Sequence, residues 1–160
     1  MKYFISSLFF ICLLALLSCD PSRVYESNED FADMRWPIKD TVEFKFEITD
    51  TTQHYNLLLN LRNSIDFETT RIFLNYSLTD STGSSIRKRL VEEFLFDRKT
   101  GEPFGDSGLG NIFQQQFPLE TNMKFPSKGK YIGKISHMMR DDTLSEVLSV
   151  GIRVERSTLN

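Results

Sequence analysis

Apolar and polar residues alternate with a period of two over most of the chain after Asp40. The clearest case is the segment 42–48 (VEFKFEI), in which every second residue is apolar and the residues between them are charged. This alternation is typical of a β-strand with one buried side and one solvent-facing side. It predicts further strands at residues 55–61, 72–78, 112–119, 130–139 and 148–154, and a brief extended piece at 123–126.

The segment 86–96 (IRKRLVEEFLF) fits two structures. In a helix, Leu90, Val91, Phe94 and Leu95 would line one face. We favour a strand, because the segment is rich in β-branched and aromatic residues and lies between strands. The chain then has seven or eight short strands separated by turn residues. This pattern predicts an all-β fold, a two-sheet antiparallel β-sandwich of jelly-roll or immunoglobulin-like type.

The first 19 residues have a different pattern. Lys2 is followed by an apolar run from Phe4 to Leu17, and then by Ser18 and Cys19. A cation, a short apolar region and a small residue at the cleavage point are typical of a secretion signal, and the cysteine that follows indicates a bacterial lipoprotein. We therefore expect cleavage before Cys19 and acylation at Cys19. Two or more acyl chains would anchor the protein stably to a lipid bilayer.

Three other structures could explain the N-terminal run. Its 14 residues are few for a membrane-spanning helix, which needs about 20. A buried core helix and a secretory signal without lipid attachment are the other two alternatives.

We expect three parts: a cleaved lipoprotein signal peptide (1–18), a lipidated N-terminus with a flexible tether (19–40), and the β-sandwich domain (41–160). The tether assignment depends on the polar, acidic composition of residues 20–40 and on their two prolines. We expect this segment to become ordered near its end, where Trp36 would pin the chain to the domain. The alternative role for Trp36 is stacking against a ligand.

Cysteine content and charge exclude several classes of function. Cys12 would leave with the signal and Cys19 would carry lipid, so the mature domain would have no free thiol for a disulfide, an iron–sulfur cluster or a cysteine zinc site. Loss of Lys2 with the signal changes the net charge from −3 to −4. A mildly acidic domain lacks the basic surface needed to bind nucleic acid or anionic lipid.

The residues offer no catalytic arrangement. His54 and His137 have no metal-ligand spacing, and no G-x-S-x-G motif marks a serine nucleophile. Glu92 and Glu93 would point to opposite faces of a strand, and the pair Asp141-Asp142 fits a solvated turn. We therefore predict no catalytic residues, no metal site and no cofactor.

A glycine-rich loop is the most distinctive local feature, because residues 97–111 hold four of the eight glycines. The run Gly108-Leu109-Gly110 lacks the preceding strand and following helix of a phosphate-binding turn. Calcium could use the oxygen ligands of Asp97, Glu102, Asp106 and Asn111, but their spacing follows no known calcium loop. Our preferred functional hypothesis is a partner-binding loop. Its residues are Gly105, Asp106, Ser107, Gly108, Leu109, Gly110 and Asn111.

Over essentially its whole length, the chain resembles the GldH family of gliding-motility lipoproteins from Bacteroidetes. Three features carry the resemblance. The first is Cys19 with the short acidic segment after it, and the second is the loop 105–112 (GDSGLGNI) running into a strand. The third is the C-terminal order of G-x-Y, M-R-x-D-x-L and V-G-hydrophobic-R-hydrophobic-E motifs, at residues 129–131, 139–144 and 150–155.

The resemblance implies a non-enzymatic component of the envelope machinery that moves adhesins along the cell surface. Its partners would be other gliding and type IX secretion envelope proteins, and its location the outer membrane, on the periplasmic face. One alternative is a carbohydrate-binding lipoprotein, for which Trp36, Tyr55 and Tyr131 are the candidate stacking residues. A second is a hydrolase whose carboxylates converge only in the folded chain.

Overall fold

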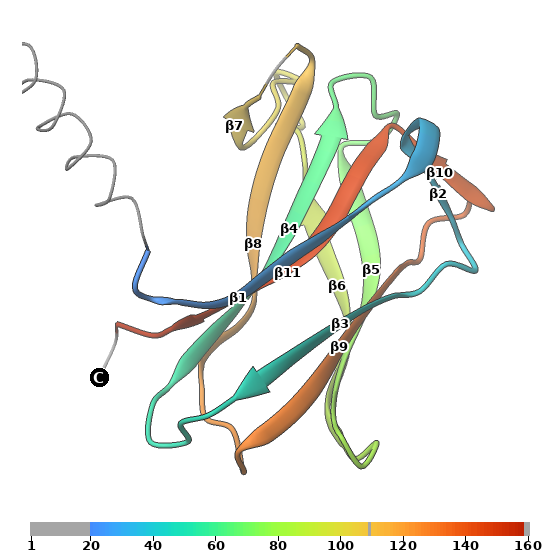
Figure 1. Cartoon of the computed structure of the whole chain (residues 1–160). Helices are drawn as coiled ribbons and strands as arrows, with labels where there is room; N and C mark the ends of the chain where they lie inside the picture. Colours follow the sequence, from blue (N-terminus) through green and yellow to red (C-terminus); the bar gives the residue numbers. More distant parts are fainter. Residues whose placement is uncertain (1–19, 109, 159–160) are drawn as a thin grey trace, which may run out of the picture.

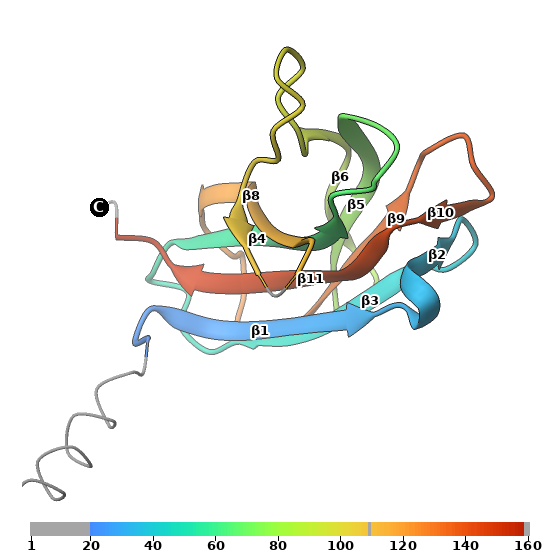
Figure 2. The same ribbon diagram turned by 90° about the horizontal axis from the view of Figure 1, so that it is seen from above.

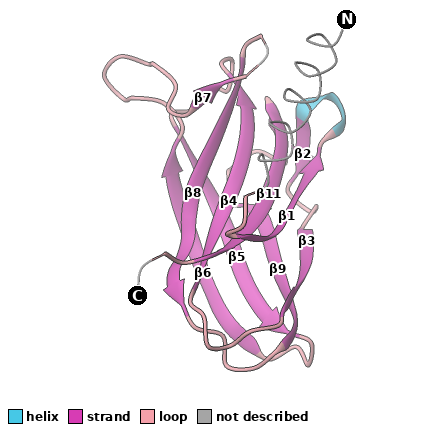
Figure 3. Ribbon diagram, turned by 60° about the vertical axis from the view of Figure 1, so that its left-hand side comes forward, coloured by secondary structure: helices cyan, strands magenta, loops and turns pink. Residues whose placement is uncertain are grey.

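Two antiparallel β-sheets pack face to face in the computed structural model, which describes residues 20–108 and 110–158 (Figure 1). The predicted signal peptide (1–18), the predicted lipidation site Cys19 and the loop residue Leu109 lie outside these residues. Strands dominate the described part, whose one helical element is a single 3-10 turn (Figure 3). The described residues form no helix long and apolar enough to cross a membrane.

Eleven strands and the 3-10 turn η2 follow one another along the chain. In order, they are β1 (Arg23–Asp30), η2 (Ala32–Met34), β2 (Arg35–Pro37), β3 (Val42–Ile48), β4 (Tyr55–Ser64), β5 (Arg71–Asp80), β6 (Ser85–Phe94), β7 (Asp106–Ser107), β8 (Ile112–Met123), β9 (Gly129–His137), β10 (Thr143–Ser145) and β11 (Val147–Arg156).

The five-stranded sheet has the order β1-β11-β4-β8-β7 and the four-stranded sheet the order β3-β9-β5-β6, while β10 pairs with β2. Eight strands have seven or more residues. Counted along the chain, the first of these pairs with the eighth, the second with the seventh, the third with the sixth and the fourth with the fifth. This nested pairing is that of a jelly roll. The predicted β-sandwich is confirmed, and of its two variants the structure has the jelly roll.

The core lies between the sheets and is formed by the inward-facing residues of the alternating segments. In β3, Phe44, Phe46 and Ile48 are buried while the charged residues between them are exposed, as the pattern predicts. Aromatic rings pack edge to face in the same core, with the centroids of Phe125 and Tyr131 4.6 Å apart. The described residues contain no cysteine, so burial of apolar side chains holds this part together.

The ambiguous segment 86–96 is a strand over most of its length, so the helix alternative is wrong. β6 forms an edge of the four-stranded sheet. From it, Arg87 and Arg89 reach across the open side of the sandwich to Glu120 of β8, with N–O distances of 3.3 and 3.7 Å. Charged side chains on an edge strand of this kind discourage pairing with other chains.

The prediction of a flexible tether is wrong for the described part of residues 19–40. β1 pairs with β11 from Arg23, opposite Glu155, to Asp30, opposite Ser149. The sequence of β1 lacks clear alternation because the strand lies at a sheet edge, where its side chains are at most partly buried. The sandwich therefore begins at Arg23 rather than at residue 41.

Trp36 pins the segment after β1 to the domain, as expected. Its side chain is fully buried and stacks on Phe31 with a centroid separation of 4.9 Å. Its indole N–H donates a hydrogen bond to the carbonyl oxygen of Asp40 at 2.9 Å. In the β2–β10 pair, Trp36 lies opposite Leu144, which is also buried. The ligand-stacking alternative is excluded by this burial.

Candidate functional site

The glycine-rich loop projects from the sandwich between β6 and β7 (Figure 2). The carboxylate of Asp97 accepts backbone hydrogen bonds from Lys99 at 2.7 Å and from Thr100 at 2.9 Å. These bonds lower the pKa of Asp97. The N–H of Gly101 closes the turn on the carbonyl oxygen of Asp97 at 2.9 Å. The projecting part is thus an ordered turn organised by one carboxylate.

The second half of the loop packs against β8. Gly105 has φ +93°, and a Cβ at this position would lie 2.5 Å from the carbonyl oxygen of Gln114. The residue therefore has to be glycine for two reasons, the backbone angle and the close approach. Asp106 and Ser107 then form β7, opposite Gln114 and Phe113. β7 thus pairs with the start of β8 at the edge of the five-stranded sheet.

The calcium hypothesis for this loop gains no support from the structure. In the described chain, no three or more His, Cys, Asp or Glu side chains are grouped so that they could hold a metal ion. Asp97, Glu102 and Asp106 are therefore not brought together as a carboxylate cluster. The carboxylate of Asp97 is already engaged by backbone N–H groups within its own turn.

An exposed apolar hollow lies on the outer face of the four-stranded sheet. It has a volume of about 580 Å³, and its apolar side chains are Phe73 of β5, Leu90 of β6, and Met138 and Met139 after β9. We call these four residues the apolar hollow. Leu90 is 58% exposed and Met138 is 49% exposed. Neighbouring apolar side chains left in water in this way are typical of a contact surface.

Backbone contacts fix the segment after β9 beside β5. The N–H of Met138 donates to the carbonyl oxygen of Phe73 at 2.7 Å, and the N–H of Phe73 lies 3.4 Å from the sulfur of Met139. Methionine side chains are flexible and polarizable, so they adapt to differently shaped apolar partners. The hollow thus combines a fixed backbone with adaptable side chains.

Arg71 lines the apolar hollow, and Arg98 contacts Phe94, the residue opposite Arg71 in β6. The guanidinium carbon of Arg71 lies 5.0 Å from the ring centroid of Phe73, and its Nη1 pairs with Glu92 at 2.8 Å. Arg98, from the projecting loop, lies 5.9 Å from the ring centroid of Phe94. These cation–π contacts hold cations against the sheet and give the apolar surface a charged rim.

A smaller hollow of about 240 Å³ adjoins the apolar one and shares Thr69 and Asp141 with it. Its lining includes the carboxylates of Glu68, Asp141 and Asp142. All three residues are exposed, and the Asp141-Asp142 pair lies in the connection between β9 and β10, as the sequence predicts. The combined surface is apolar at one end and acidic at the other.

A polar network crosses the outer face of the five-stranded sheet, on the opposite side of the sandwich. The side chain of Asn60 in β4 donates to Glu26 in β1 at 2.9 Å and accepts from Gln116 in β8 at 2.8 Å. Arg153 in β11 pairs with Glu26 at 3.3 Å and with Glu155 at 3.0 Å. Burial raises the pKa of Glu26, but hydrogen bonds from Arg23 and Asn60 outweigh it and lower the pKa.

The C-terminal motif at residues 150–155 is explained by these two faces. Its three apolar residues are fully buried in the core, at Val150, Ile152 and Val154. The residues between them face the polar network. The motif therefore reflects a strand whose alternate side chains pack in the core on one side and form hydrogen bonds on the outer face.

The structure buries the glycan candidates and His137, whereas His54 is partly buried. The glycan candidates Trp36, Tyr55 and Tyr131 are at most 2% exposed, so they cannot stack against a sugar. His137 is 1% exposed, and its two ring nitrogens lack hydrogen-bond partners among the described residues. Burial lowers the pKa of His137, which keeps the ring neutral.

Glu92 and Glu93 point to opposite faces of β6, as expected. Glu92 pairs with Arg71 on the outer face, whereas Glu93 is partly buried and has a pKa raised by burial. The two carboxylates therefore cannot act together on one substrate. The hydrolase alternative gains no support from this pair.

The apolar hollow is the feature that sequence reasoning missed. A signal was present, since Leu90 and Phe73 stand at outward positions of their strands, where polar residues are usual. The pattern could not show that these side chains are adjacent, because they come from different strands.

Comparisons with known proteins identify relatives of this chain. The chain is 29% identical over 157 residues to a gliding motility lipoprotein GldH homolog of Christiangramia forsetii, with 94% of each chain covered. It is 26% identical over 158 residues to the gliding motility lipoprotein GldH of Flavobacterium johnsoniae, covering 94% of this chain and 96% of the relative.

Among solved structures, the infectious bursal disease virus Gx strain matches with a TM-score of 0.45 and 14% identity, over 88% of this chain and 34% of the viral chain.

The family described as GldH lipoprotein matches residues 23–154, a range that extends from the start of β1 almost to the end of β11. The chain therefore belongs to the GldH lipoprotein family, which is associated with gliding motility and with the cell envelope.

Proposed function

We propose that this protein is a non-catalytic component of the gliding-motility machinery that binds other envelope proteins. Acyl chains on Cys19 would anchor it to the outer membrane, with the domain on the periplasmic side. Family membership supports the role in motility. The exposed apolar hollow is the observation that carries the binding role.

The chemistry of the hollow favours a protein partner over a glycan. Four of its lining side chains are phenylalanine, leucine and methionine, which offer a sugar no strong hydrogen-bonding group, and the polar residues Thr69, Arg71, Arg140 and Asp141 complete the lining. A partner segment with an apolar side chain would fill it, and a basic side chain next to that residue would lie beside Glu68 and Asp142 in the adjoining acidic hollow.

The predicted partner-binding loop, residues 105–111, belongs to the same proposal as a second contact. The projecting turn before it is linked to the apolar surface through Arg98, which lies over Phe94. A partner seated on the hollow could therefore also contact this turn and the residues 105–111 that follow it.

Cross-linking in live cells tests the proposal. Leu90→Asp places a charge in the hollow and should abolish cross-links to envelope partners. Ile38→Asp is the matched control, since Ile38 is 42% exposed but does not line the hollow, and it should leave them intact. Equal cross-linking of the two variants would contradict the binding role of the hollow.

A further inference from the structure

The residues that directly follow Cys19 are held against the five-stranded sheet by hydrogen bonds and an ion pair. Asp20, the residue bonded to Cys19, accepts hydrogen bonds from the backbone N–H of Ser22 at 3.0 Å and from its hydroxyl at 2.7 Å. The same carboxylate forms an ion pair with Arg153. β1 begins only three residues further on, at Arg23.

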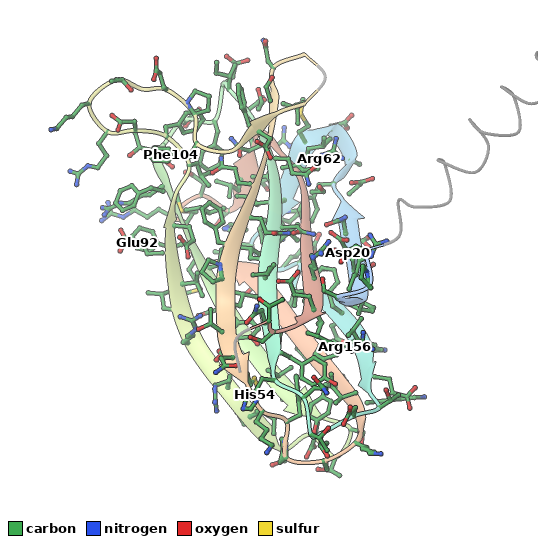
Figure 4. All side chains as sticks on the ribbon, turned by 90° about the vertical axis from the view of Figure 1, so that its left-hand side faces the viewer. Asp20, His54, Arg62, Glu92, Phe104 and Arg156 are labelled. Atoms are coloured by element: carbon green, nitrogen blue, oxygen red, sulfur yellow. The ribbon has the colours of Figure 1, made fainter. Side chains whose placement is uncertain are left out.

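A second arginine holds the residues between Asp20 and β1. The guanidinium of Arg156 donates a hydrogen bond to the carbonyl oxygen of Pro21 at 2.8 Å. The backbone N–H of Arg156 donates a hydrogen bond to the carbonyl oxygen of Ser22, also at 2.8 Å. Residues 20, 21 and 22 therefore each have a bond to the end of β11. Figure 4 shows Asp20 and Arg156 on the same side of the sandwich.

Arg153 is itself held in place. Its side chain is only 17% exposed, and its guanidinium also pairs with Glu26 and Glu155. Arginine presents its N–H donors in a rigid planar fork, so three carboxylates can hold it in one orientation. Hydrogen bonds from Ser22 and then from Arg153 lower the pKa of Asp20 to about 2, so this carboxylate is charged at neutral pH.

The reach of the anchor follows from these contacts. A free tether of residues 20–40 would extend about 70 Å, at about 3.3–3.6 Å per residue. With residues 20–22 fastened, the Cα atom of Cys19 can lie only about 3.8 Å from that of Asp20. The lipid would therefore leave the domain beside Arg153, on the outer face of the five-stranded sheet.

This position is opposite to the apolar hollow. Arg153 belongs to the outer face of the five-stranded sheet, and the hollow to the outer face of the four-stranded sheet. In Figure 4, Asp20 and Glu92, the ion-pair partner of Arg71 beside the hollow, lie at opposite edges of the view, Asp20 near β1 and Glu92 on β6.

We propose that Arg153 and Arg156 clamp the lipidated N-terminus, so that the outer face of the five-stranded sheet lies toward the bilayer and the apolar hollow faces away from it. The inference depends on the proposed acylation of Cys19. The partner of the membrane-facing side is the hydrated headgroup layer, which suits the amides of Asn28 and Gln116 and the mixed charges of Glu26 and Arg153. The clamp thus orients the protein as well as anchoring it.

A single-cysteine experiment tests the orientation. Since the acylated Cys19 thiol is blocked, a fluorophore can be attached selectively to Gln114→Cys or to Asn75→Cys in the full lipidated protein. Both positions are exposed amides, Gln114 on the five-stranded sheet and Asn75 beside Leu90 on the four-stranded sheet. Each protein is reconstituted into phosphatidylcholine vesicles that contain a lipid with a nitroxide headgroup, which quenches only nearby fluorophores.

We expect stronger quenching at Gln114→Cys than at Asn75→Cys. Adding Asp20→Asn, which leaves the pairs of Arg153 with Glu26 and Glu155, should remove most of this difference. Adding Arg153→Gln should do the same. Arg71→Gln, which breaks an ion pair on the other sheet, is the matched control and should preserve the difference.

The outcomes separate the two proposals. Protein that floats with the vesicles but is quenched equally at both sites overturns the clamp and leaves the anchor intact. The same holds if Asp20→Asn and Arg153→Gln leave the difference unchanged. Protein that does not float with the vesicles refutes acylation at Cys19, and the clamp with it.

Discussion

Gly151 of β11 lies directly beneath the side chain of Asn28 of β1. A Cβ at Gly151 would overlap the amide oxygen of Asn28 and would come within 2.6 Å of the carbonyl oxygen of Ser27. Asn28 in turn accepts a hydrogen bond from Asn60 at 3.3 Å. The missing side chain at Gly151 therefore makes room for the polar network between β1 and β4.

Gly151→Ala should destabilise the domain. Overpacking a close contact costs about 1–3 kcal/mol, and the added methyl group would displace Asn28 or β1 itself. We expect a lower midpoint of urea unfolding and faster hydrogen exchange in β1. Gly83→Ala is a useful control, since a Cβ there meets nothing within 4 Å and only the positive φ of +85° is affected. A Gly151→Ala midpoint above that of Gly83→Ala would contradict this packing argument.

His137 should make the domain less stable in mild acid. Burial lowers its pKa in the folded state, whereas in the unfolded chain it titrates near 6.5. The unfolded state then binds more protons below that value, so the free energy of unfolding falls as the pH decreases from about 7 to about 5. His137→Leu should reduce this fall, measured by urea unfolding at several pH values.

The aspartates with lowered pKa values do not contribute to this decline between pH 7 and 5, and Glu93, whose pKa is raised by burial, acts in the opposite direction to His137. The pKa values of Asp20, Asp50, Asp80 and Asp97 are lowered in the folded state by hydrogen bonds to their carboxylates. Their stabilisation is complete above their unfolded value and is lost only as the pH falls below about 4. An unchanged decline between pH 7 and 5 in His137→Leu would therefore assign the effect to another group.

Cys19→Ser should abolish incorporation of labelled palmitate and release the protein from the membrane fraction. Serine lacks the thiol to which the acyl group would be attached, and two or more acyl chains are what make such an anchor stable. Cys12→Ser is the control, because this residue would be removed with the signal peptide. Persistent labelling of Cys19→Ser would refute the proposed anchor.

Deletion of residues 105–110 should leave the sandwich folded and weaken partner association. The deletion removes β7, a two-residue strand that pairs only with the start of β8. The eight long strands and the core are untouched, so circular dichroism and the unfolding midpoint should change little. Co-purification of partners at the wild-type level would argue against a contact by this loop.

The sequence was most informative where strands face both core and solvent. The segment 42–48 shows clean alternation because Phe44, Phe46 and Ile48 point into the core from a strand whose other side is exposed. β1 shows no such pattern, since it is held mainly by backbone pairing at an edge and by the polar network of Glu26 and Asn28. Backbone pairing and polar contacts of this kind do not produce an alternation of apolar and polar residues.

The candidate site was harder to predict, because it depends on residues brought together by strand pairing. Phe73 and Leu90 are 17 positions apart, and Met138 is far from both, yet all three line one hollow. The motif 139–144 supported the family resemblance but did not indicate a binding surface. The clamp at Asp20 was equally hidden, since Arg153 lies at the other end of the chain.

The nested jelly-roll pairing brings the first and last long strands together, with the N–H of Ser157 bonded to the carbonyl oxygen of His54 just beyond β11. An epitope tag or fluorescent reporter fused after β11 would consequently lie close to Asp20 and to the lipid anchor proposed at Cys19, and we expect it to disturb membrane attachment. The turn at Asp97–Gly101, which projects away from the sandwich (Figure 2), is the better insertion point for such a reporter in living cells.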